Sequence, residues 1–388
     1  MKRLRVGVVY GGRSGEHEVS IASAAAVIAN LDSRRYEAVP IRIERSGQWT
    51  LADRPPSSAS AADAIQHARL EAAKVARPVR EVHLLARPGD ETIVTLDRPA
   101  ESNARALAGR PVVTGLGLDV VFPVLHGPYG EDGTIQGLLE LANVPYVGAG
   151  VLASALGMDK AVAKRVFAAH GLPVGTYRVV LARDWVRDRA AVVEATVAQL
   201  GFPLFVKPAN LGSSVGITKA KDHAGLHAAI DLAASFDRKI IIEAAVPDAR
   251  EIECAVLGND DPRASVPGEI VPSREFYDYE AKYLDDGSTL LIPAPLSPEQ
   301  TSEIQRLALA AFRAIDGAGL ARVDFLMARA TGEICLNEIN TIPGFTTISM
   351  YAKLWAASGL DYAALLDRLI ALGLERHAEK QHRRIDQA

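Results

Sequence analysis

Two neighbouring strand-like runs near the end of the chain carry polar side chains where a buried strand would be apolar. In the first run, Arg322 and Asp324 are two positions apart and therefore lie on one face. In the second run, 333–340, Glu338 and Asn340 share a face for the same reason. We expect a hairpin that pairs Asp324 with Glu338 and Arg322 with Asn340, which gathers these side chains on one surface.

The chemistry of this surface is that of a hard-metal site. Carboxylate and amide oxygens without His or Cys suit Mg²⁺ held jointly with substrate phosphates, so Asp324, Glu338 and Asn340 are candidate ligands. The alternative is a solvated surface hairpin, since charged residues are mostly exposed. We favour the metal site because alternation also puts the apolar Ile334 and Leu336 on the Glu338 face.

The bulk composition excludes several classes of protein. The chain has 388 residues, 48% of them hydrophobic and 23% charged, as expected of a soluble globular protein with two or three domains. A net charge of -4 with scattered Lys and Arg gives no basic patch, so nucleic acid is not an expected partner. No run approaches the ~20 apolar residues of a membrane span. Two cysteines in apolar runs indicate no disulfide framework, and we expect a cytoplasmic protein that does not bind membranes.

The N-terminal stretch predicts the opening of a doubly wound parallel sheet. The apolar run Leu4–Tyr10 leads into a glycine turn at 11–15, and helical periodicity follows at 20–31. The glycine spacing matches no dinucleotide or P-loop motif, which argues against an NAD-dependent dehydrogenase. Glu16, at the carboxyl end of the strand, is placed to face a ligand crevice; a tight turn without a ligand is the alternative.

A second buried strand, Asp119–Leu125, ends in His126 and a glycine-rich loop. A His at the carboxyl end of a strand, before a helix, can meet an anion or a carboxylate; a His that caps the loop is the alternative. The alanine-rich stretch 52–110 offers no chemistry and is read as elaboration of the first domain, with a helix near Ala61–Ala76. We place a domain boundary near Gly148.

A Gly/Ser loop and a tyrosine-rich segment predict a polyphosphate site that can be closed. Lys207 ends a buried strand, and the loop after it contains Ser213 and Ser214, whose hydroxyl and backbone N–H groups can fold over phosphates. A flexible turn is the alternative. The irregular segment Gly268–Pro295 contains three tyrosines and is expected to be a lid that excludes water.

The remaining elements follow from periodicity. We expect strands at Ala38–Ile43, Val179–Leu181, Val215–Thr218, Lys239–Glu243 and Arg250–Gly258, and helices at Ala153–His170, Ser297–Ile315 and Ala352–Ala371. From Glu375 a polar tail is expected to be frayed.

Six motifs, in this order, resemble those of the D-alanine:D-alanine ligases of the ATP-grasp superfamily. They are Gly-Gly-x-Ser-x-Glu-x-Glu-Val-Ser (11–20), His-Gly-x-x-Gly-Glu-Asp-Gly (126–133), Val-Lys-Pro with Gly-Ser-Ser-Val-Gly (206–216), Tyr-Asp-Tyr-Glu-Ala-Lys-Tyr (277–283), Arg-x-Asp (322–324) and Asn-Glu-Ile-Asn-Thr-Ile-Pro-Gly (337–344). The resemblance runs from Val6 to about Leu372. One motif alone would be weak evidence, whereas six in order are specific.

The resemblance implies an α/β fold of three domains. These are a substrate-binding domain at 1–148, a central ATP-grasp domain at 149–242 and a C-terminal ATP-grasp domain with the metal and catalytic site at 243–372, before a polar tail at 373–388. The implied reaction joins two D-alanines through an acyl phosphate, releases ADP and phosphate, and serves peptidoglycan precursor synthesis. ATP is the implied co-substrate, two Mg²⁺ ions, replaceable by Mn²⁺, are the implied metal, and a homodimer is expected.

The site roles of the family fall on positions of this chain that match its motifs. For ATP they are Lys160, Lys207, Ser213, Ser214, Glu243, Glu251 and Lys282, and for the metal Asp324, Glu338 and Asn340. For the first D-alanine they are Glu16 and His126, and for the second Lys282, Ser349 and Met350. Arg322 and the Gly344 N–H form the implied oxyanion hole, and hydrogen bonds among Glu16, Ser213 and Tyr283 fasten the lid.

The chain departs from some relatives at two positions. Ala244 replaces a lysine next to the adenine site, and Leu211 replaces an acidic residue in the Gly/Ser loop. The sequence that ends in Tyr283 resembles dipeptide-forming members rather than those that make D-alanyl-D-lactate. A related carboxylate–amine or D-alanine:D-lactate ligase is the alternative function. A nucleotide-binding regulator without catalysis is a further one, against which the full set of metal ligands, Arg322 and both lysines argues.

Overall fold

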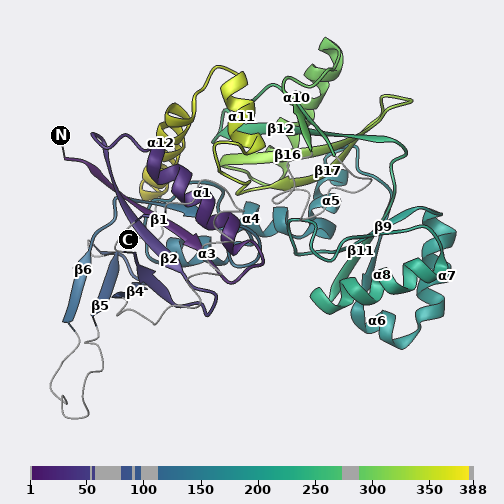
Figure 1. Ribbon diagram of the computed structural model, residues 1–388, viewed down its shortest axis with the longest axis horizontal. Helices are drawn as coiled ribbons and strands as arrows, with labels where there is room; N and C mark the ends of the chain where they lie inside the picture. The colour runs from purple at the N-terminus through teal and green to yellow at the C-terminus, as the bar shows by residue number, and fades with distance from the viewer. Residues whose placement is uncertain are drawn as a thin grey trace.

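The computed structural model describes residues 2–52, 55–56, 80–89, 92–97, 112–272 and 288–383. These residues form three β-sheets with flanking helices (Figure 1), which confirms the expected α/β fold. The expected helix near Ala61–Ala76 and the central part of the expected lid lie outside the described residues. Within the described ranges, no helix is long and apolar enough to cross a membrane.

The first sheet has seven strands in the order β6-β5-β4-β3-β2-β1-β7. Its strands are β1 (Leu4–Gly11), β2 (Tyr36–Ile43), β3 (Trp49–Leu51), β4 (Arg80–Leu84), β5 (Ile93–Asp97), β6 (Val112–Leu116) and β7 (Val120–Val124). Among the described strands, β2-β1-β7 pair in parallel and the other neighbours pair antiparallel. An isolated parallel bridge also joins Tyr146 to Val121 of β7. The expected doubly wound parallel sheet is therefore this three-stranded core. Helix α1 (His17–Asn30) packs on one face of it and α3 (Thr134–Leu141) on the other.

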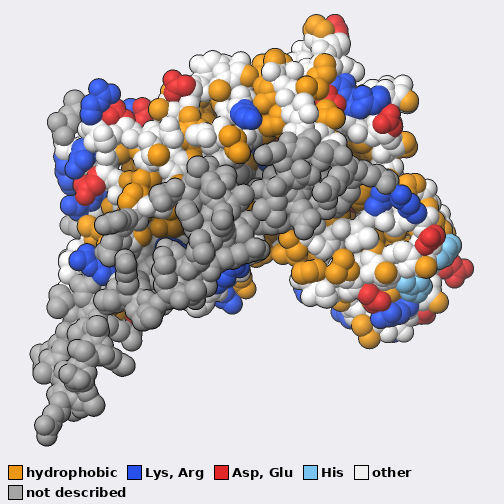
Figure 2. All heavy atoms as spheres, viewed as in Figure 1, with side chains coloured by type: hydrophobic (Ala, Val, Ile, Leu, Met, Phe, Trp, Pro, Cys, Tyr) orange, Lys and Arg blue, Asp and Glu red, His pale blue; other side chains and the backbone are white. Residues whose placement is uncertain are grey.

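The second sheet is antiparallel, in the order β10-β9-β11-β8. It contains β8 (Tyr177–Leu181), β9 (Leu204–Pro208), β10 (Thr218–Ala220) and β11 (Lys239–Ala244), and its helices are α6 (Ala182–Arg187), α7 (Arg189–Leu200) and α8 (His223–Phe236). The helices share one apolar core with a single face of the sheet. Acidic, basic and His side chains are interspersed on the outer surface of this unit, at the lower right of Figure 2. Lys207 and Glu243 lie on the other face of the sheet, together with Ile241 and Phe205.

Two boundaries in this region differ from expectation. The strand expected at Val215–Thr218 begins only at Thr218, because Ser213, Ser214 and Gly216 all have left-handed φ values and turn the chain there. The domain boundary expected at 242 falls inside β11, which pairs with β8 and β9 up to Ala244.

The third sheet has the order β15-β14-β12-β16-β17, with β13 paired to β12. Its strands are β12 (Ala249–Gly258), β13 (Arg263–Ala264), β14 (Gly268–Val271), β15 (Thr289–Leu291), β16 (Gly319–Ala328) and β17 (Ile334–Asn340). Strands β14 and β15 lie within Gly268–Pro295, which was expected to be irregular throughout. The predicted lid is therefore restricted to the residues between these two strands. Helix α10 (Pro298–Ala314) covers this sheet and begins with a capping box at Ser297.

Helices α4 (Val151–Met158) and α5 (Lys160–Ala169) replace the single helix expected at Ala153–His170. Asp159 breaks the helix with an extended backbone and caps α5 by accepting a hydrogen bond from the Val162 N–H. Apolar residues of both helices belong to the core of the third sheet, although the central domain was expected to start at residue 149. The two helices therefore pack with the third sheet.

The last two helices also differ from expectation. The helix expected at Ala352–Ala371 is divided into α11 (Met350–Ala357) and α12 (Tyr362–Gln381), because Gly359 has a left-handed φ and Asp361 caps the new helix. The prediction of a frayed polar tail is wrong as far as Gln381. Lys380 pairs with Glu140 of α3, and this ion pair holds the end of α12 against the helix that packs on the first sheet.

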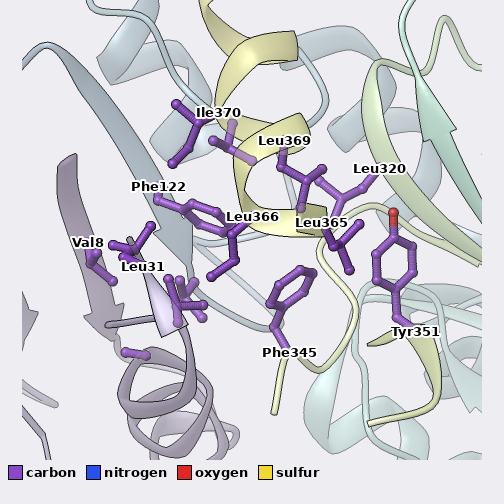
Figure 3. Close-up of a cluster of buried hydrophobic side chains, with 14 of the residues drawn as sticks. Val8, Leu31, Phe122, Leu320, Phe345, Tyr351, Leu365, Leu366, Leu369 and Ile370 are labelled. Atoms are coloured by element: carbon purple, nitrogen blue, oxygen red, sulfur yellow. The ribbon is translucent and has the colours of Figure 1, made fainter. Parts of the chain in front are cut away.

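The first sheet with α1 and α3 is called the first unit, the second sheet with α6, α7 and α8 the second unit, and the third sheet with α10, α11 and α12 the third unit. One hydrophobic core joins the first and third units. Figure 3 shows Val8, Leu31 and Phe122 of the first unit against Leu365, Leu366, Leu369 and Ile370 of α12, with Leu320, Phe345 and Tyr351 beside them. The second sheet has a core of its own. The site described next is framed by all three units.

Candidate active site

The hairpin β16-β17 has the register that the sequence predicts. Arg322 lies opposite Asn340, and Asp324 lies opposite Glu338. Strand β12 pairs with the other edge of β16 and places Glu253 opposite Asp324. Four polar side chains and a carboxylate of β12 thus gather on one face of the third sheet.

A β-bulge in the hairpin corrects the predicted alternation along β17. The ladder pairs Asp324 with Glu338 but the next residue, Phe325, with Leu336, so Asn337 has no partner in β16. Leu336 and Ile339 therefore both point into the apolar core, where each is buried. The expectation that Ile334 and Leu336 share the Glu338 face is wrong. Because of the bulge, Asn337 lies outside the pairing with β16, and its Oδ1 accepts a hydrogen bond of 3.2 Å from Lys207 Nζ.

Arg322 is held by carboxylates on both sides. Its Nε and Nη2 each donate a 2.7 Å hydrogen bond to Asp324, and its Nε lies 3.0 Å from Oε2 of Glu253. Burial lowers the pKa of Arg322, but the carboxylates of Asp324 and Glu253 outweigh it and raise the pKa well above its usual value. Asn340 Nδ2 donates a 3.0 Å hydrogen bond to Asp324 Oδ2. This guanidinium is therefore a fixed positive charge at the end of the hairpin.

Lys160 connects the hairpin to the Gly/Ser loop. Its Nζ donates a 2.7 Å hydrogen bond to the Leu211 carbonyl and lies 3.4 Å from Oε2 of Glu338. Lys160 is the first residue of α5, and the backbone break at Asp159 directs it toward this contact. An ammonium group thus stands between a candidate metal ligand and the loop expected to cover phosphates.

Glu243 stands between two buried lysines, one of which the sequence analysis missed. Glu243 Oε2 accepts a 2.7 Å hydrogen bond from Lys207 Nζ, and its Oε1 lies 3.1 Å from Lys164 Nζ. Burial raises the pKa of Glu243, but the two ammonium groups outweigh it and lower the pKa to about 2. Lys164 is only 2% exposed. Its position four residues after Lys160, on the same helix face, was the available signal.

Glu16 joins the first unit to the Gly/Ser loop. Its carboxylate accepts a hydrogen bond from the Ser213 hydroxyl, as the resemblance implies. Two glycines make room for the carboxylate, because a Cβ at Gly127 or Gly212 would lie 2.8 Å from Glu16 Oε2. The third member of the expected bridge, Tyr283, lies outside the described residues, as does Lys282.

His126 and Glu131 lie behind Glu16. His126 Nδ1 is 2.9 Å from the Ile342 carbonyl, and burial lowers the pKa of the ring. Glu131, which the sequence analysis did not single out, accepts hydrogen bonds from the N–H groups of Gly127 (2.7 Å) and Ile342 (3.2 Å). Burial, and then the charge of Glu16, raise the pKa of Glu131 to about 8. The signal for it was an acidic residue in a glycine loop directly after a buried strand.

The other expected site residues occupy different surroundings. Glu251 shares the face of Asp324 on the third sheet, and Ser214 follows Ser213 in the Gly/Ser loop. Ser349 accepts a 2.9 Å hydrogen bond from the Thr346 N–H and begins α11. The Met350 side chain is buried in the shared core, so it offers a substrate little surface.

The oxygen ligands predicted for a metal can be tested against this geometry. Among the described residues, no group of three or more His, Cys, Asp or Glu side chains could hold an ion. Asp324 and Glu338 with the Asn340 amide therefore provide only part of a coordination shell. Such a set fits Mg²⁺, which binds one or two carboxylates and takes its remaining ligands from water and phosphates.

Comparison with known families decides what this arrangement is. A family model described as the D-ala D-ala ligase N-terminus matches residues 5–149, and one described as the D-ala D-ala ligase C-terminus matches residues 166–371. The chain belongs to the D-alanine–D-alanine ligase family. The predicted resemblance is thereby confirmed over nearly the whole chain.

Individual members of the D-alanine–D-alanine ligase family are similar along their full length. A D-alanine–D-alanine ligase from Heliobacterium modesticaldum is 50% identical over 382 residues, which cover 98% of this chain and 97% of the relative. The solved ligase structure from Coxiella burnetii is 36% identical, covers 98% of this chain and 97% of its own, and superimposes with a TM-score of 0.78. A D-Ala:D-Ser ligase from Enterococcus faecalis is 34% identical, with coverage of 96% and 100% and a TM-score of 0.79.

Proposed function

We propose that this protein joins two D-alanines to D-alanyl-D-alanine at the cost of one ATP, for peptidoglycan precursor synthesis. Membership of the D-alanine–D-alanine ligase family supports the reaction. The observation that carries it is the register of the β16-β17 hairpin, which sets Asp324 and Glu338 opposite each other beside Arg322. Lys160 faces the same group from α5. Oxygen ligands, a fixed guanidinium and an ammonium group in one place suit phosphoryl transfer followed by acyl transfer.

The reaction has two chemical steps. A carboxylate oxygen of the first D-alanine attacks the γ-phosphorus of ATP, the bond from that phosphorus to the bridging oxygen breaks, and ADP leaves. The amine of the second D-alanine then attacks the carbonyl carbon of the acyl phosphate. The tetrahedral intermediate breaks its carbon–oxygen bond to release inorganic phosphate, and the amine loses a proton. An acyl phosphate hydrolyses in water, which is the reason for a lid over the site.

The ATP site follows from the second sheet and the loops around it. Lys160 and Lys207 bind the phosphates, and the backbone N–H groups around Ser213 and Ser214 cover them. Glu243 and Glu251 bind the adenine and ribose. Lys207 also donates a hydrogen bond to Glu243, which ties the proposed phosphate contact to the proposed adenine and ribose contact.

Two Mg²⁺ ions complete the proposed site, held by Asp324, Glu338 and Asn340. When bound, they neutralise charge on the transferred phosphate, and Mn²⁺ serves as a substitute because it also prefers oxygen ligands. Arg322 and Lys160 form ion pairs with Asp324 and Glu338.

The amino-acid substrates occupy the space between the hairpin and the first unit. Glu16 binds the ammonium of the first D-alanine, with His126 behind it, and Ser349, the Met350 backbone and Lys282 bind the carboxylate of the second. Arg322 and the Gly344 N–H stabilise the tetrahedral oxyanion, a contribution of roughly 3 to 4 kcal/mol per donor. We place the protein in the cytoplasm and expect it to be a homodimer. Size-exclusion chromatography with light scattering tests the dimer.

Product analysis tests the function. We expect phosphate release from ATP that depends on D-alanine, and D-alanyl-D-alanine as the product identified by mass spectrometry. D-Serine belongs in the same series because one similar structure is a D-Ala:D-Ser ligase. Faster phosphate release with D-serine, D-lactate or L-alanine as second substrate would refute the proposed specificity. ATP binding without D-alanine-dependent release would favour a nucleotide-binding regulator.

Substitutions in the hairpin test the metal site. Asp324→Ala and Glu338→Ala are each expected to abolish turnover while the circular dichroism spectrum keeps its native form. Glu333→Ala is the matched control, since Glu333 is an exposed carboxylate on the same hairpin. Turnover that survives in both site variants would contradict the metal assignment.

A further inference from the structure

Both backbone polar groups of Ile342, two residues after the end of β17, contact the first unit. The Ile342 N–H donates a 3.2 Å hydrogen bond to Oε1 of Glu131. The Ile342 carbonyl oxygen lies 2.9 Å from Nδ1 of His126. Both contacts come from the loop after β7, in the first unit, although Ile342 belongs to the third.

The segment after β17 is fixed again three residues later. The Phe345 N–H donates a 3.2 Å hydrogen bond to Oγ of Ser23 in α1, and the Phe345 carbonyl accepts a 2.5 Å hydrogen bond from the Tyr362 hydroxyl. Between these points, Pro343 has no N–H. Among the described residues, no hydrogen bond to the Gly344 N–H is found. Within 342–345, Gly344 therefore has the one N–H left for a ligand.

The protonation of His126 follows from its partners. Nδ1 faces a carbonyl oxygen and must carry the proton, so Nε2 of the neutral ring accepts a hydrogen bond from the Ser23 hydroxyl at 3.1 Å. His126 is 4% exposed. Both ring nitrogens are thus engaged within the protein, and neither is available to a substrate.

We propose that Ser23, His126 and Glu131 are positioning residues that hold the 342–345 segment so that the Gly344 N–H points at the oxyanion of the second step. This inference rests on the proposed function, which assigns that role to Gly344. It replaces substrate binding by His126 with a hydrogen-bonded chain from the first unit to the third. The amino-terminal unit then contributes to amide formation as well as to holding the first D-alanine.

Steady-state kinetics separates positioning from substrate binding. Ser23→Ala, His126→Ala and Glu131→Gln are expected to lower kcat by ~10- to 100-fold with KM for ATP and D-alanine changed less than about threefold, because a donor misplaced by about 1 Å loses its contribution. His126→Asn should restore much of kcat, since its amide can donate to the Ile342 carbonyl. Ser154→Ala is the matched control: a buried serine on α4 whose hydroxyl has no hydrogen bond, for which no change is expected.

A partial reaction locates the affected step. With ATP that carries ¹⁸O in the β,γ bridge, D-alanine-dependent scrambling of the label reports reversible acyl phosphate formation. The Ser23, His126 and Glu131 variants are expected to scramble the label at the wild-type rate and to lose dipeptide formation. If His126→Ala does not fold, Ser23→Ala, which removes only one oxygen atom, becomes the decisive variant.

Three results would overturn the proposal. They are a rise of about tenfold or more in the KM for D-alanine at unchanged kcat, an equal loss of scrambling and dipeptide formation, and unchanged kinetics in Ser23→Ala. If the wild-type protein neither scrambles the label nor forms dipeptide with D-alanine, the proposed function fails instead of the positioning role.

Discussion

The buried pair of lysines around Glu243 gives a stability prediction that can be worked through. The ammonium groups of Lys164 and Lys207 lower the pKa of Glu243 from 4.5 to about 2 against the opposing effect of burial. A tenfold change in proton affinity corresponds to about 1.4 kcal/mol, so the ionised carboxylate contributes about 3 kcal/mol to the free energy of unfolding at pH 7. Glu243→Gln should remove this contribution, a loss within the range found when one partner of a buried ion pair is deleted.

The pH dependence has a defined sign. The folded-state pKa is below the unfolded-state value, so the stabilisation is complete above about pH 4.5 and is lost as the pH falls toward 2. The difference between wild type and Glu243→Gln is therefore expected to shrink by roughly 1 kcal/mol between pH 7 and pH 4.

Hydrogen–deuterium exchange of the β11 amides in the ligand-free protein measures the opening free energy of this unit. Glu194→Gln is the control, because Glu194 is an exposed glutamate on α7 of the same unit. A loss below about 1 kcal/mol at pH 7, or a loss that does not change with pH, would refute the assignment of the stabilisation to the Glu243 charge.

Three further predictions concern packing and capping. Gly212→Ala should reduce kcat in the phosphate-release assay, because its Cβ would lie 2.8 Å from Glu16 Oε2, whereas Gly137→Ala, with open space around the new methyl group, should not. Leu366→Ala removes a fully buried side chain of the shared core and should destabilise the protein by about 2 to 5 kcal/mol in urea denaturation; a loss under about 1 kcal/mol would contradict a tight fit. Ser297→Ala removes the capping box of α10 and should cost about 1 kcal/mol, measured by exchange of the first-turn amides.

The register of the hairpin was accessible from sequence because its period and turn are both local. Alternation over the strand of Arg322 and a turn at Gly332 leave few ways to pair the two runs. The bulge at Asn337 was not accessible, since an extra residue leaves no mark in an alternating run until its partner strand is known. Because of the bulge, Ile334 and Leu336 lie on the face opposite to Glu338, and Asn337 reaches Lys207.

Residues in a motif were also easier to find than residues that support them. Lys207 stands in the Val-Lys-Pro motif, whereas Lys164 is a lysine in an alanine-rich helix whose partner, Glu243, is distant in sequence. His126 was also found, and its predicted contact with substrate stays a prediction beside the positioning role proposed above. Its hydrogen bond to Ile342 spans 216 positions of the chain and depends on how the first and third units dock.

The core shared by the first and third units has a consequence for synthesis of the chain. Val8 of β1 packs in one cluster with Leu366 and Leu369 of α12, which leave the ribosome more than 350 residues later (Figure 3). Helix α1 covers part of this face of the first sheet early, but the part that packs against α12 stays uncovered until translation is almost complete. The second unit, whose core is built from residues 180–242, can close earlier. The amino-terminal half is the part of the nascent chain that needs protection from aggregation. A stop codon before α12 would remove from this core the five buried side chains Leu365, Leu366, Leu369, Ile370 and Leu372.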